Sequence, residues 1–264
     1  MSAVDYRRQT TLITGASAGI GAEFARQIAQ RGSDVVLVAR RRERLEKLAA
    51  ELAATHGVRA TAIPLDLGLP GAGETLAEEV ARRGLTVTSV VNNAGFATFG
   101  PFHTEDPQRL REEIAVDIAA LVDISRAFIG PLRSAGSGVL VNVASMAAYL
   151  PVPNMAVYAA AKAFVLSFTE ALWQESRGTG LRVLALSPGA TNTEFFDTIG
   201  TEADGGAKRQ SPQEVVATAL AALDRRTPPP SVVSGRRNRV MASLSRGLTR
   251  RRAVLVMGSM TGAR

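Results

Sequence analysis

Short apolar runs alternate with longer segments of helical periodicity along most of this chain. The runs that we expect to form strands cover residues 10–14, 35–39, 58–65, 87–91, 139–143, 181–186 and 231–233. The segments that we expect to form helices cover residues 22–30, 43–55, 74–83, 107–132, a stretch that follows Pro153, and 212–223. This alternation predicts an α/β fold, a single domain with a doubly wound, mostly parallel seven-stranded sheet and helices on both faces.

Length and composition agree with one large domain. Of the 264 residues, 46% are hydrophobic and 21% are charged, which is ordinary for a globular protein. The absence of cysteine excludes disulfides and thiolate metal sites and favours a reducing, cytoplasmic setting. The two histidines, His56 and His103, are far apart in sequence, so we expect neither a metal site nor a histidine triad. Residues 1–9 are polar and predict no signal peptide, and no apolar run approaches the roughly 20 residues that span a bilayer.

Positive charge is concentrated at the C-terminal end. The net charge is +7, but the segment after Asp224 has ten arginines and no acidic residue, which leaves the rest of the chain at about −3. We therefore expect a main domain at residues 1–224 and a basic extension at residues 225–264. The extension is expected to pack on the same domain as a short strand and a helix.

The extension has several interpretations. Its arginines alternate with Val240, Met241, Leu244 and Leu248 at approximately helical spacing. Such a helix could lie on an anionic membrane surface. It could instead pack on the domain or at a subunit interface with its arginines outward. Nucleic-acid binding is not expected, because the extension has no aromatic side chains for stacking.

A glycine loop follows the first strand. Gly15, Gly19 and Gly21 stand between the strand at 10–14 and the helix at 22–30. Glycines permit a tight turn and close backbone approach, while the helix N-terminus offers unpaired N–H groups to a pyrophosphate. The pattern predicts a dinucleotide site; the alternative is a glycine turn needed only for helix–strand packing.

The second strand ends in arginines. In dinucleotide-binding folds an acidic residue at this position binds the ribose 2′-hydroxyl, whereas arginine accommodates a 2′-phosphate. Here Arg40 and Arg41 stand at the strand end, and Asp34 lies at the strand's start, too far back to reach. The pattern favours NADP(H) over NAD(H); the alternative is a solvated basic helix start.

Two more strand ends carry polar residues. Asp66 follows the third strand and could accept from an adenine amino group, although aspartate is also a common turn residue. The fourth strand ends in Asn92-Asn93-Ala94-Gly95, where small residues allow backbone close to a cofactor and amides can tie neighbouring strand ends together.

Ser145, Tyr158 and Lys162 form the main candidate for catalysis. Ser145 follows the strand at 139–143, and Tyr158 and Lys162 share one face of the next helix at positions i and i+4. An ammonium beside a phenol favours the phenolate and lowers the tyrosine pKa from about 10 toward neutrality. Such a tyrosine can give or take a proton at a carbonyl or hydroxyl oxygen, to which Ser145 could also hydrogen-bond.

With the glycine loop, the run at 92–95, Ser145, Tyr158, Lys162 and Pro188-Gly189 in this order, the chain resembles the classical short-chain dehydrogenase/reductase (SDR) family over about residues 8–223. The resemblance implies a Rossmann fold and hydride transfer between a nicotinamide and a carbonyl carbon without a metal. It implies Tyr158 as general acid/base, Lys162 as holder of the nicotinamide ribose, and Ser145 as polariser of the substrate oxygen.

The resemblance also implies a cofactor site and an assembly. Besides Tyr158 and Lys162, the implied cofactor-binding residues are Gly15, Ser17, Gly19, Ile20, Gly21, Arg40, Arg41, Asp66, Leu67, Asn93, Ala94, Gly95, Pro188, Gly189, Thr191 and Thr193. Because family members usually form dimers or tetramers, we expect a homodimer or homotetramer.

Asp117 departs from the family pattern. The family has an asparagine at this point of the long helix, where it supports a proton-relay water beside the lysine; here the stretch reads Ala115-Val116-Asp117-Ile118. An ionised aspartate only accepts hydrogen bonds, favours the Lys162 ammonium and disfavours the Tyr158 phenolate. We expect Asp117 to belong to the catalytic set with a shifted pH optimum. The alternative is a helix-bending residue with no catalytic role.

The sequence thus predicts an NADP(H)-dependent oxidoreductase acting on a ketone, an aldehyde or a secondary alcohol. An apolar or acyl-type carbonyl is expected from the candidates for the substrate side, Phe96, Phe99, Phe102, Tyr149, Leu150, Phe195 and Phe196. Residues 191–210 are expected to form a lid or a surface connection. The alternative function is a catalytically weak or idle dinucleotide-binding sensor or scaffold.

Overall fold

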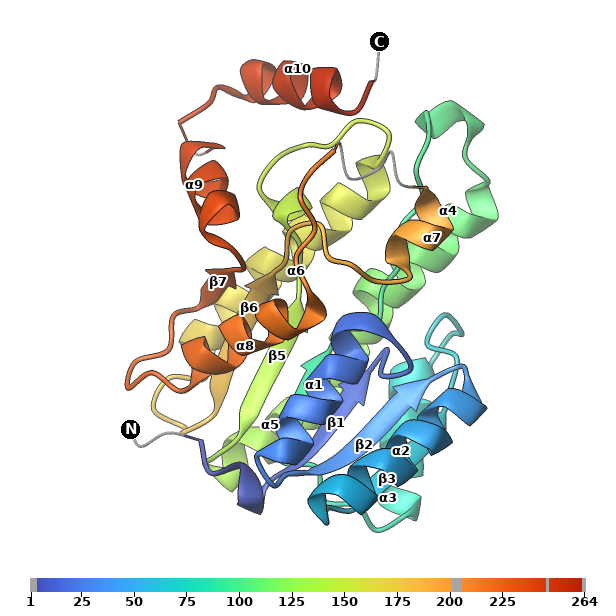
Figure 1. Ribbon diagram of the computed structural model, residues 1–264, viewed down its shortest axis with the longest axis vertical. Helices are drawn as coiled ribbons and strands as arrows, with labels where there is room; N and C mark the ends of the chain where they lie inside the picture. Colours follow the sequence, from blue (N-terminus) through green and yellow to red (C-terminus); the bar gives the residue numbers. More distant parts are fainter. Residues whose placement is uncertain (1–3, 201–205, 246, 263–264) are drawn as a thin grey trace.

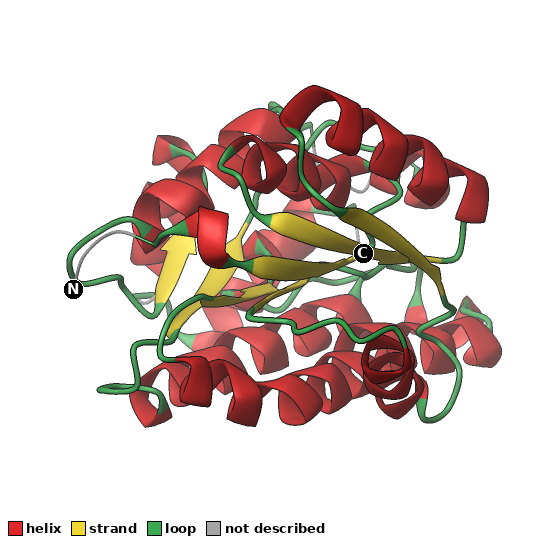
Figure 2. Cartoon of the chain, turned by 90° about the horizontal axis from the view of Figure 1, so that it is seen from below, coloured by secondary structure: helices red, strands yellow, loops and turns green. Residues whose placement is uncertain are grey.

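The computed structural model describes residues 4–200, 206–245 and 247–262. Its centre is a seven-stranded sheet in the order β3-β2-β1-β4-β5-β6-β7, and every strand pair is parallel (Figure 1). Helices lie above and below the sheet (Figure 2). The predicted fold class is confirmed.

The strands are close to the apolar runs of the sequence. They are β1 (Thr10–Thr14), β2 (Asp34–Ala39), β3 (Ala60–Pro64), β4 (Ser89–Asn92), β5 (Val139–Val143), β6 (Arg182–Ser187) and β7 (Ser231–Val233). The main helices are α1 (Gly19–Gln30), α2 (Arg42–His56), α3 (Ala72–Arg82), α4 (Pro107–Ile114), α5 (Leu121–Ala135), α6 (Ala156–Glu175), α7 (Phe195–Ile199), α8 (Pro212–Leu223), α9 (Arg236–Ser245) and α10 (Arg250–Met260). Short 3₁₀ turns cover Tyr6–Arg8, Phe102–Thr104 and Met146–Ala148.

The inner strands are apolar throughout because both of their faces are covered. On β1, Ile13 belongs to the core under α1, α2 and α8, and the adjacent Leu12 belongs to the core under α3 and α5. Both side chains are 0% exposed. A parallel sheet buried on two sides reads as such a continuous hydrophobic run, which is why the sequence shows no alternation there.

The helical segment that begins at Pro107 is not uniform. The expected helix over 107–132 extends to Ala135, but a π-helical segment, Ala115–Ala120, separates α4 from α5. Asp117 lies inside this segment. Single π-helical turns change the direction of side chains and are frequent at functional sites.

The basic extension contains β7, which pairs with β6, and two helices where one was expected. A new helix starts at Arg250 because the Thr249 side chain caps it, accepting from the Arg252 N–H at 3.4 Å. No helix in the described ranges is long and apolar enough to cross a membrane.

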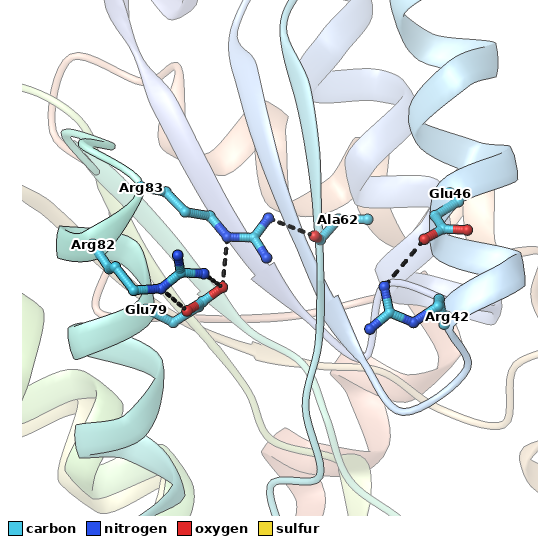
Figure 3. Close-up of polar contacts among 6 residues, drawn as sticks. All are labelled: Arg42, Glu46, Ala62, Glu79, Arg82 and Arg83. Carbon is cyan, nitrogen blue, oxygen red and sulfur yellow. Dashed lines mark hydrogen bonds and ion pairs between the residues drawn. The ribbon is translucent and has the colours of Figure 1, made fainter.

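An arginine side chain covers the outer edge of β3, one of the two edge strands of the sheet. Arg83 donates to the carbonyl oxygen of Ala62 at 3.0 Å and pairs with Glu79 at 2.6 Å (Figure 3). Hydrogen bonds from Arg82 and Arg83 lower the pKa of Glu79 to about 2. Charged side chains along an edge strand discourage its pairing with another sheet.

Candidate active site

The site lies at the carboxyl end of the sheet, where β1 and β4 are neighbours and the strand order reverses direction. Ligands of doubly wound sheets bind at such a switch point. The two strand ends are joined by Thr14, whose Oγ1 accepts from the N–H groups of Asn93 and Ala94, each at 3.0 Å. Asn93 Nδ2 in turn donates to the Thr14 carbonyl at 3.0 Å. The sequence correctly assigned Asn93 to tying neighbouring strand ends.

The glycine loop fits a pyrophosphate. Gly15 and Gly19 have φ of +67° and +55°, which other residues rarely adopt. A Cβ atom on Gly21 would lie 2.5 Å from Asn93 Nδ2, and one on Gly19 would lie 2.9 Å from Thr193 Cγ2. No side chain caps the N-terminus of α1 at Ala18. Unpaired N–H groups and a closely approaching backbone are the features that cradle phosphate.

Arg41 reaches from the end of β2 to the glycine loop. Its Nη2 and Nε donate to Ser17 Oγ at 3.0 and 3.2 Å, so both predicted cofactor residues lie together. Glu194, which immediately precedes α7, accepts from Arg41 at 2.7 Å and from Arg44 at 2.6 Å. Arg40, the residue before Arg41, is exposed.

Lys162 and Tyr158 meet as their spacing predicted. Lys162 Nζ lies 5.4 Å from the centre of the Tyr158 ring and donates to the Val143 carbonyl at 3.3 Å. Burial raises the Tyr158 pKa, and the Ser145 side chain lies close enough to the tyrosine hydroxyl to oppose part of this rise. The three residues therefore form one cluster at the end of β5.

Asp117 joins this cluster. Its Oδ2 lies 2.8 Å from Lys162 Nζ, with both side chains almost completely buried, and its Oδ1 accepts from the Phe96 N–H at 3.0 Å. A Cβ atom on Gly95 would lie 2.9 Å from Asp117 Oδ1 and 3.1 Å from Lys162 Nζ. Only glycine therefore leaves room for this ion pair.

The ionisation of the cluster differs from the sequence expectation. Burial raises the pKa of Tyr158 above its ordinary value, and the Asp117 and Glu113 charges add to this rise, while Lys162 and Ser145 oppose it. Burial alone would lower the pKa of Lys162, but Asp117 and Tyr158 raise it, so Lys162 is an ammonium. In the protein by itself, the lysine does not bring the tyrosine toward neutrality, because burial and two carboxylates outweigh it.

A buried hydrogen-bond chain fixes the helices beneath the cluster. Asn92 on β4 donates to Ser125 on α5 at 3.1 Å and to Asn142 on β5 at 2.9 Å. Asn142 donates to Thr169 on α6 at 3.0 Å. The chain fixes α5, which follows the segment that contains Asp117, and α6, which carries Lys162, relative to the strands.

Of the remaining residues predicted to bind the cofactor, some lie in turns and others pack against the hydrophobic cores. Asp66 accepts from the Gly68 N–H at 3.0 Å in a turn, and Leu67 is buried in the core under α3. The Pro188 carbonyl accepts from the N–H of Met146 at 2.8 Å, and Thr191 Oγ1 donates to the Gly189 carbonyl at 2.9 Å. Ile20 packs against the core under α1.

Apolar side chains gather beside Tyr158. Phe195 lies with its ring 5.6 Å from the Tyr158 ring, and Phe99, Val152 and Met257 belong to the same cluster.

Phe196 instead lies under the Arg209 guanidinium, and Phe96 under that of Arg109. Phe102 is 65% exposed, and Tyr149 lines a separate surface hollow with Arg225 and Arg239. Leu150 is partly buried. Residues 201–205 of the expected lid lie outside the described residues.

Sequence reasoning missed three residues here. Met257 comes from the basic extension, Glu194 from the segment after β6, and Glu113 from the face of α4 toward the cluster. A tether supports the position of α10, since Asn154 donates to the Thr261 carbonyl at 3.2 Å.

Known proteins resemble the chain in sequence and in structure. The family model of short chain dehydrogenases matches residues 9–204. Sulfoacetaldehyde reductase 2 of Chromohalobacter salexigens is 38% identical over 186 residues, which are 70% of this chain and 73% of that protein. The 7beta-hydroxysteroid dehydrogenase of Collinsella aerofaciens is 31% identical over 235 residues, 86% of each chain. A short-chain dehydrogenase from Sphingobium yanoikuyae, solved in complex with NADPH, superposes with a TM-score of 0.79 at 32% identity, covering 90% of this chain and 94% of that one.

The chain belongs to the short-chain dehydrogenase/reductase family. It is accordingly an oxidoreductase of alcohol and carbonyl groups that binds a nicotinamide dinucleotide.

Proposed function

We propose that this protein is an NADP(H)-dependent oxidoreductase that interconverts a ketone or aldehyde with the corresponding alcohol. The observation that carries the proposal is the cluster of Ser145, Tyr158 and Lys162 at the end of β5, beside a glycine loop that fits a pyrophosphate. The nicotinamide, when bound, supplies or accepts the hydride at the substrate carbon.

The side chains of the cluster would then transfer one proton to or from the substrate oxygen. In reduction, the Tyr158 hydroxyl would give its proton to the substrate oxygen while Ser145 hydrogen-bonds the same oxygen; in oxidation the proton returns to the phenolate. Lys162, kept as an ammonium by Asp117, would stabilise the phenolate and hold the nicotinamide ribose. We assign Asp117 to positioning Lys162.

The preference for NADP(H) is supported by Arg41. Its guanidinium contacts Ser17 on the glycine loop, and Arg40 and Arg44 lie nearby in the chain. Arginines at this strand end accommodate a 2′-phosphate, and one structural relative was solved with NADPH. The main chain at Asp66, Leu67, Ala94, Pro188 and Thr191 would line the rest of the dinucleotide.

An apolar substrate is supported by the wall beside Tyr158. Phe195 packs against the tyrosine ring, and Phe99 and Met257 belong to the same apolar cluster, which favours a hydrophobic carbonyl compound. The named relatives include a hydroxysteroid dehydrogenase and a sulfoacetaldehyde reductase, so the choice of an apolar substrate rests on this cluster.

Tyr158→Phe tests the proposal. NADPH oxidation against a panel of ketones and aldehydes is expected to fall by about 10²–10⁴-fold in this variant, because it lacks the transferable proton. Fluorescence titration with NADPH should show retained binding. Binding without turnover on any substrate in the wild type would favour the sensor or scaffold alternative.

Three sequence expectations are kept as proposals. The pairing of β7 with β6 supports a basic extension that belongs to the same domain as residues 1–224. A homodimer or homotetramer and a cytoplasmic location remain predictions from the sequence and its resemblance.

A further inference from the structure

A second buried carboxylate lies beside the ion pair of Asp117 and Lys162. Glu113, in the last turn of α4, is 0% exposed, as is Asp117 four residues later. Glu113 Oε2 accepts from the Thr98 N–H at 3.0 Å, just as Asp117 accepts from the Phe96 N–H. The two carboxylates thus hold the same loop after β4.

Glu113 has a polar atom without a partner. Its Oε1 is buried and makes no hydrogen bond with any residue in the described part of the chain. Leaving an ionised oxygen in such a place is costly, since a buried charge needs a counter-charge and hydrogen bonds. A protonated carboxyl avoids most of that cost.

The charges around Glu113 leave it no counter-ion. Asp117 faces it from its own helical segment, and Lys162 and Tyr158 face it from α6. The loop after β4 contributes the N–H and the hydroxyl of Thr98, which are uncharged and, together with the Lys162 charge, only partly oppose a rise in the Glu113 pKa. Because the one ammonium is already paired with Asp117 at 2.8 Å, ionised Glu113 would add an unbalanced negative charge. Burial and the Asp117 charge accordingly raise the pKa of Glu113 to about 7.

We propose that Glu113 is a proton-holding residue of the active site, which keeps the cluster neutral while protonated and, once ionised, opposes ionisation of the Tyr158 hydroxyl. It is a positioning residue, because it acts on Tyr158 through its charge. Its own proton exchanges with solvent, so no electrons move and no bond forms with substrate. The inference rests on the proposed function only for the role of Tyr158 as the proton donor and acceptor.

The consequence is that the site has a second ionisation, which occurs at a lower pH than that of the tyrosine. In reduction, the proton that Tyr158 gives to the substrate leaves negative charge on its oxygen, and in oxidation Tyr158 must already carry that charge to accept the proton. Below about pH 7 that charge develops beside a neutral Glu113, and above it beside an anion. Loss of the Glu113 proton therefore makes the phenolate harder to form at alkaline pH.

Glu113→Gln separates this role from a purely structural one. Glutamine keeps an oxygen for the Thr98 N–H but cannot ionise. Glu112→Gln is the matched control, since Glu112 is the adjacent residue and its partly exposed carboxylate pairs with Arg109. A role limited to holding the loop predicts the same behaviour for Glu113→Gln and the wild type.

The readout is the ultraviolet absorbance of tyrosinate as a function of pH. The chain has three tyrosines, so subtracting the titration of Tyr158→Phe isolates Tyr158. The Tyr158 titration is expected to move down by about one pH unit in Glu113→Gln, the size of effect that a nearby buried charge produces. It should stay unchanged in Glu112→Gln. Superimposable curves for Glu113→Gln and the wild type would overturn the proposal.

A second measurement uses the unmodified protein. Infrared spectra with ¹³C-labelled glutamate should show a neutral buried carboxyl band at pH 6 that is lost by pH 8. The absence of that band at pH 6 also overturns the proposal. Neither readout needs a substrate, so failure here is distinct from a failure of the proposed function, which Tyr158→Phe turnover tests.

Discussion

Arg41 and Glu194 form an ion pair of 2.7 Å although 153 positions separate them in the chain. The pair joins the end of β2 to the segment that leads into α7. Glu194 also binds Arg44, and both arginines lower its pKa through hydrogen bonds. In the proposed NADP(H) complex the 2′-phosphate would bind these two guanidinium groups, so Glu194 would compete with the cofactor for them.

Glu194→Gln is expected to lower the Kd for NADPH about threefold and to leave that for NADH unchanged, because it removes the competing charge. Arg41→Ala should raise the Kd for NADPH and again spare NADH. Fluorescence titration measures both. Glu46→Gln, which removes the partner of Arg42 on the outer side of α2, is the control. Weaker NADPH binding in Glu194→Gln would contradict this expectation. It would show that Glu194 helps binding, by holding the segment before α7 against Arg41, more than it hinders binding by competing with the 2′-phosphate.

Asp117→Asn tests the ion pair with Lys162. Asparagine preserves the size and the acceptor for the Phe96 N–H but removes the charge that raises the pKa of Tyr158. The rising limb of the pH–rate profile for alcohol oxidation should therefore move to lower pH by about one unit. Superimposable profiles would assign Asp117 to shaping the helix alone. Asp123→Asn, on the exposed side of α5, is the control.

Gly95→Ala should damage catalysis more than folding. The added methyl group would meet the carboxylate of Asp117 and the ammonium of Lys162 at about 3 Å, so the ion pair has to move. We expect kcat to fall at least about tenfold, since small displacements of catalytic groups have effects of this size. Gly130→Ala on α5 is the matched control, because its added methyl meets no atom within 4 Å. Equal kcat values for the two variants would contradict the assigned geometry.

Glu113 should also make stability depend on pH. Its pKa is about 7 in the folded protein against 4.5 when unperturbed. Between these values the folded state keeps a proton that the unfolded state releases, so the free energy of unfolding falls as pH rises. The loss is complete above about pH 7 and amounts to at most about 3 kcal/mol.

In the variant Glu113→Gln, this fall in the free energy of unfolding with rising pH should be absent. Urea unfolding at several pH values should show the variant gaining on the wild type as the pH rises from 4.5 to 7. A difference that stays constant with pH would mean that Glu113 is already ionised at pH 4.5.

The basic extension predicts binding to anionic vesicles. Val240, Leu244 and Leu255 are 58%, 69% and 62% exposed, among arginines and without an acidic residue nearby in sequence. Such a surface gains from both lipid contact and charge attraction, whereas a second copy would bring like charges together. Leu244→Ser with Leu255→Ser should reduce sedimentation with phosphatidylglycerol vesicles, and Leu69→Ser, exposed elsewhere, should not. A change of oligomeric state in the double variant instead would make this face a subunit interface.

The sequence predicted those parts of the site that depend on neighbouring residues. The glycine loop, Arg41 at a strand end, and Tyr158 with Lys162 one turn apart depend on spacing within one or two elements. Their encounter at the sheet's carboxyl end follows from the parallel topology. Even the proximity of Asp117 to Lys162 could be predicted from the sequence, because the long helix follows the strand that ends in Asn92.

The missed residues depend on packing between distant segments. Glu113 reads as one more charged position on a polar helix, and only the loop that folds over it removes it from water. Met257 joins the apolar cluster that contains Tyr158 because α10 packs back on the domain, and its path depends on the break near Thr249. The rise in the Tyr158 pKa is likewise a sum over burial and several charges, and spacing alone reveals only the Lys162 contribution.

The position of α10 bears on how the enzyme matures. The helix is fastened through Thr261 to Asn154, whose own carbonyl accepts from Gly100, so one residue connects α10 to the segments on both sides of the site. The residues of α10 are translated after β7, the last strand of the sheet. The Met257 side chain can therefore complete the apolar cluster beside Tyr158 only after those residues have left the ribosome.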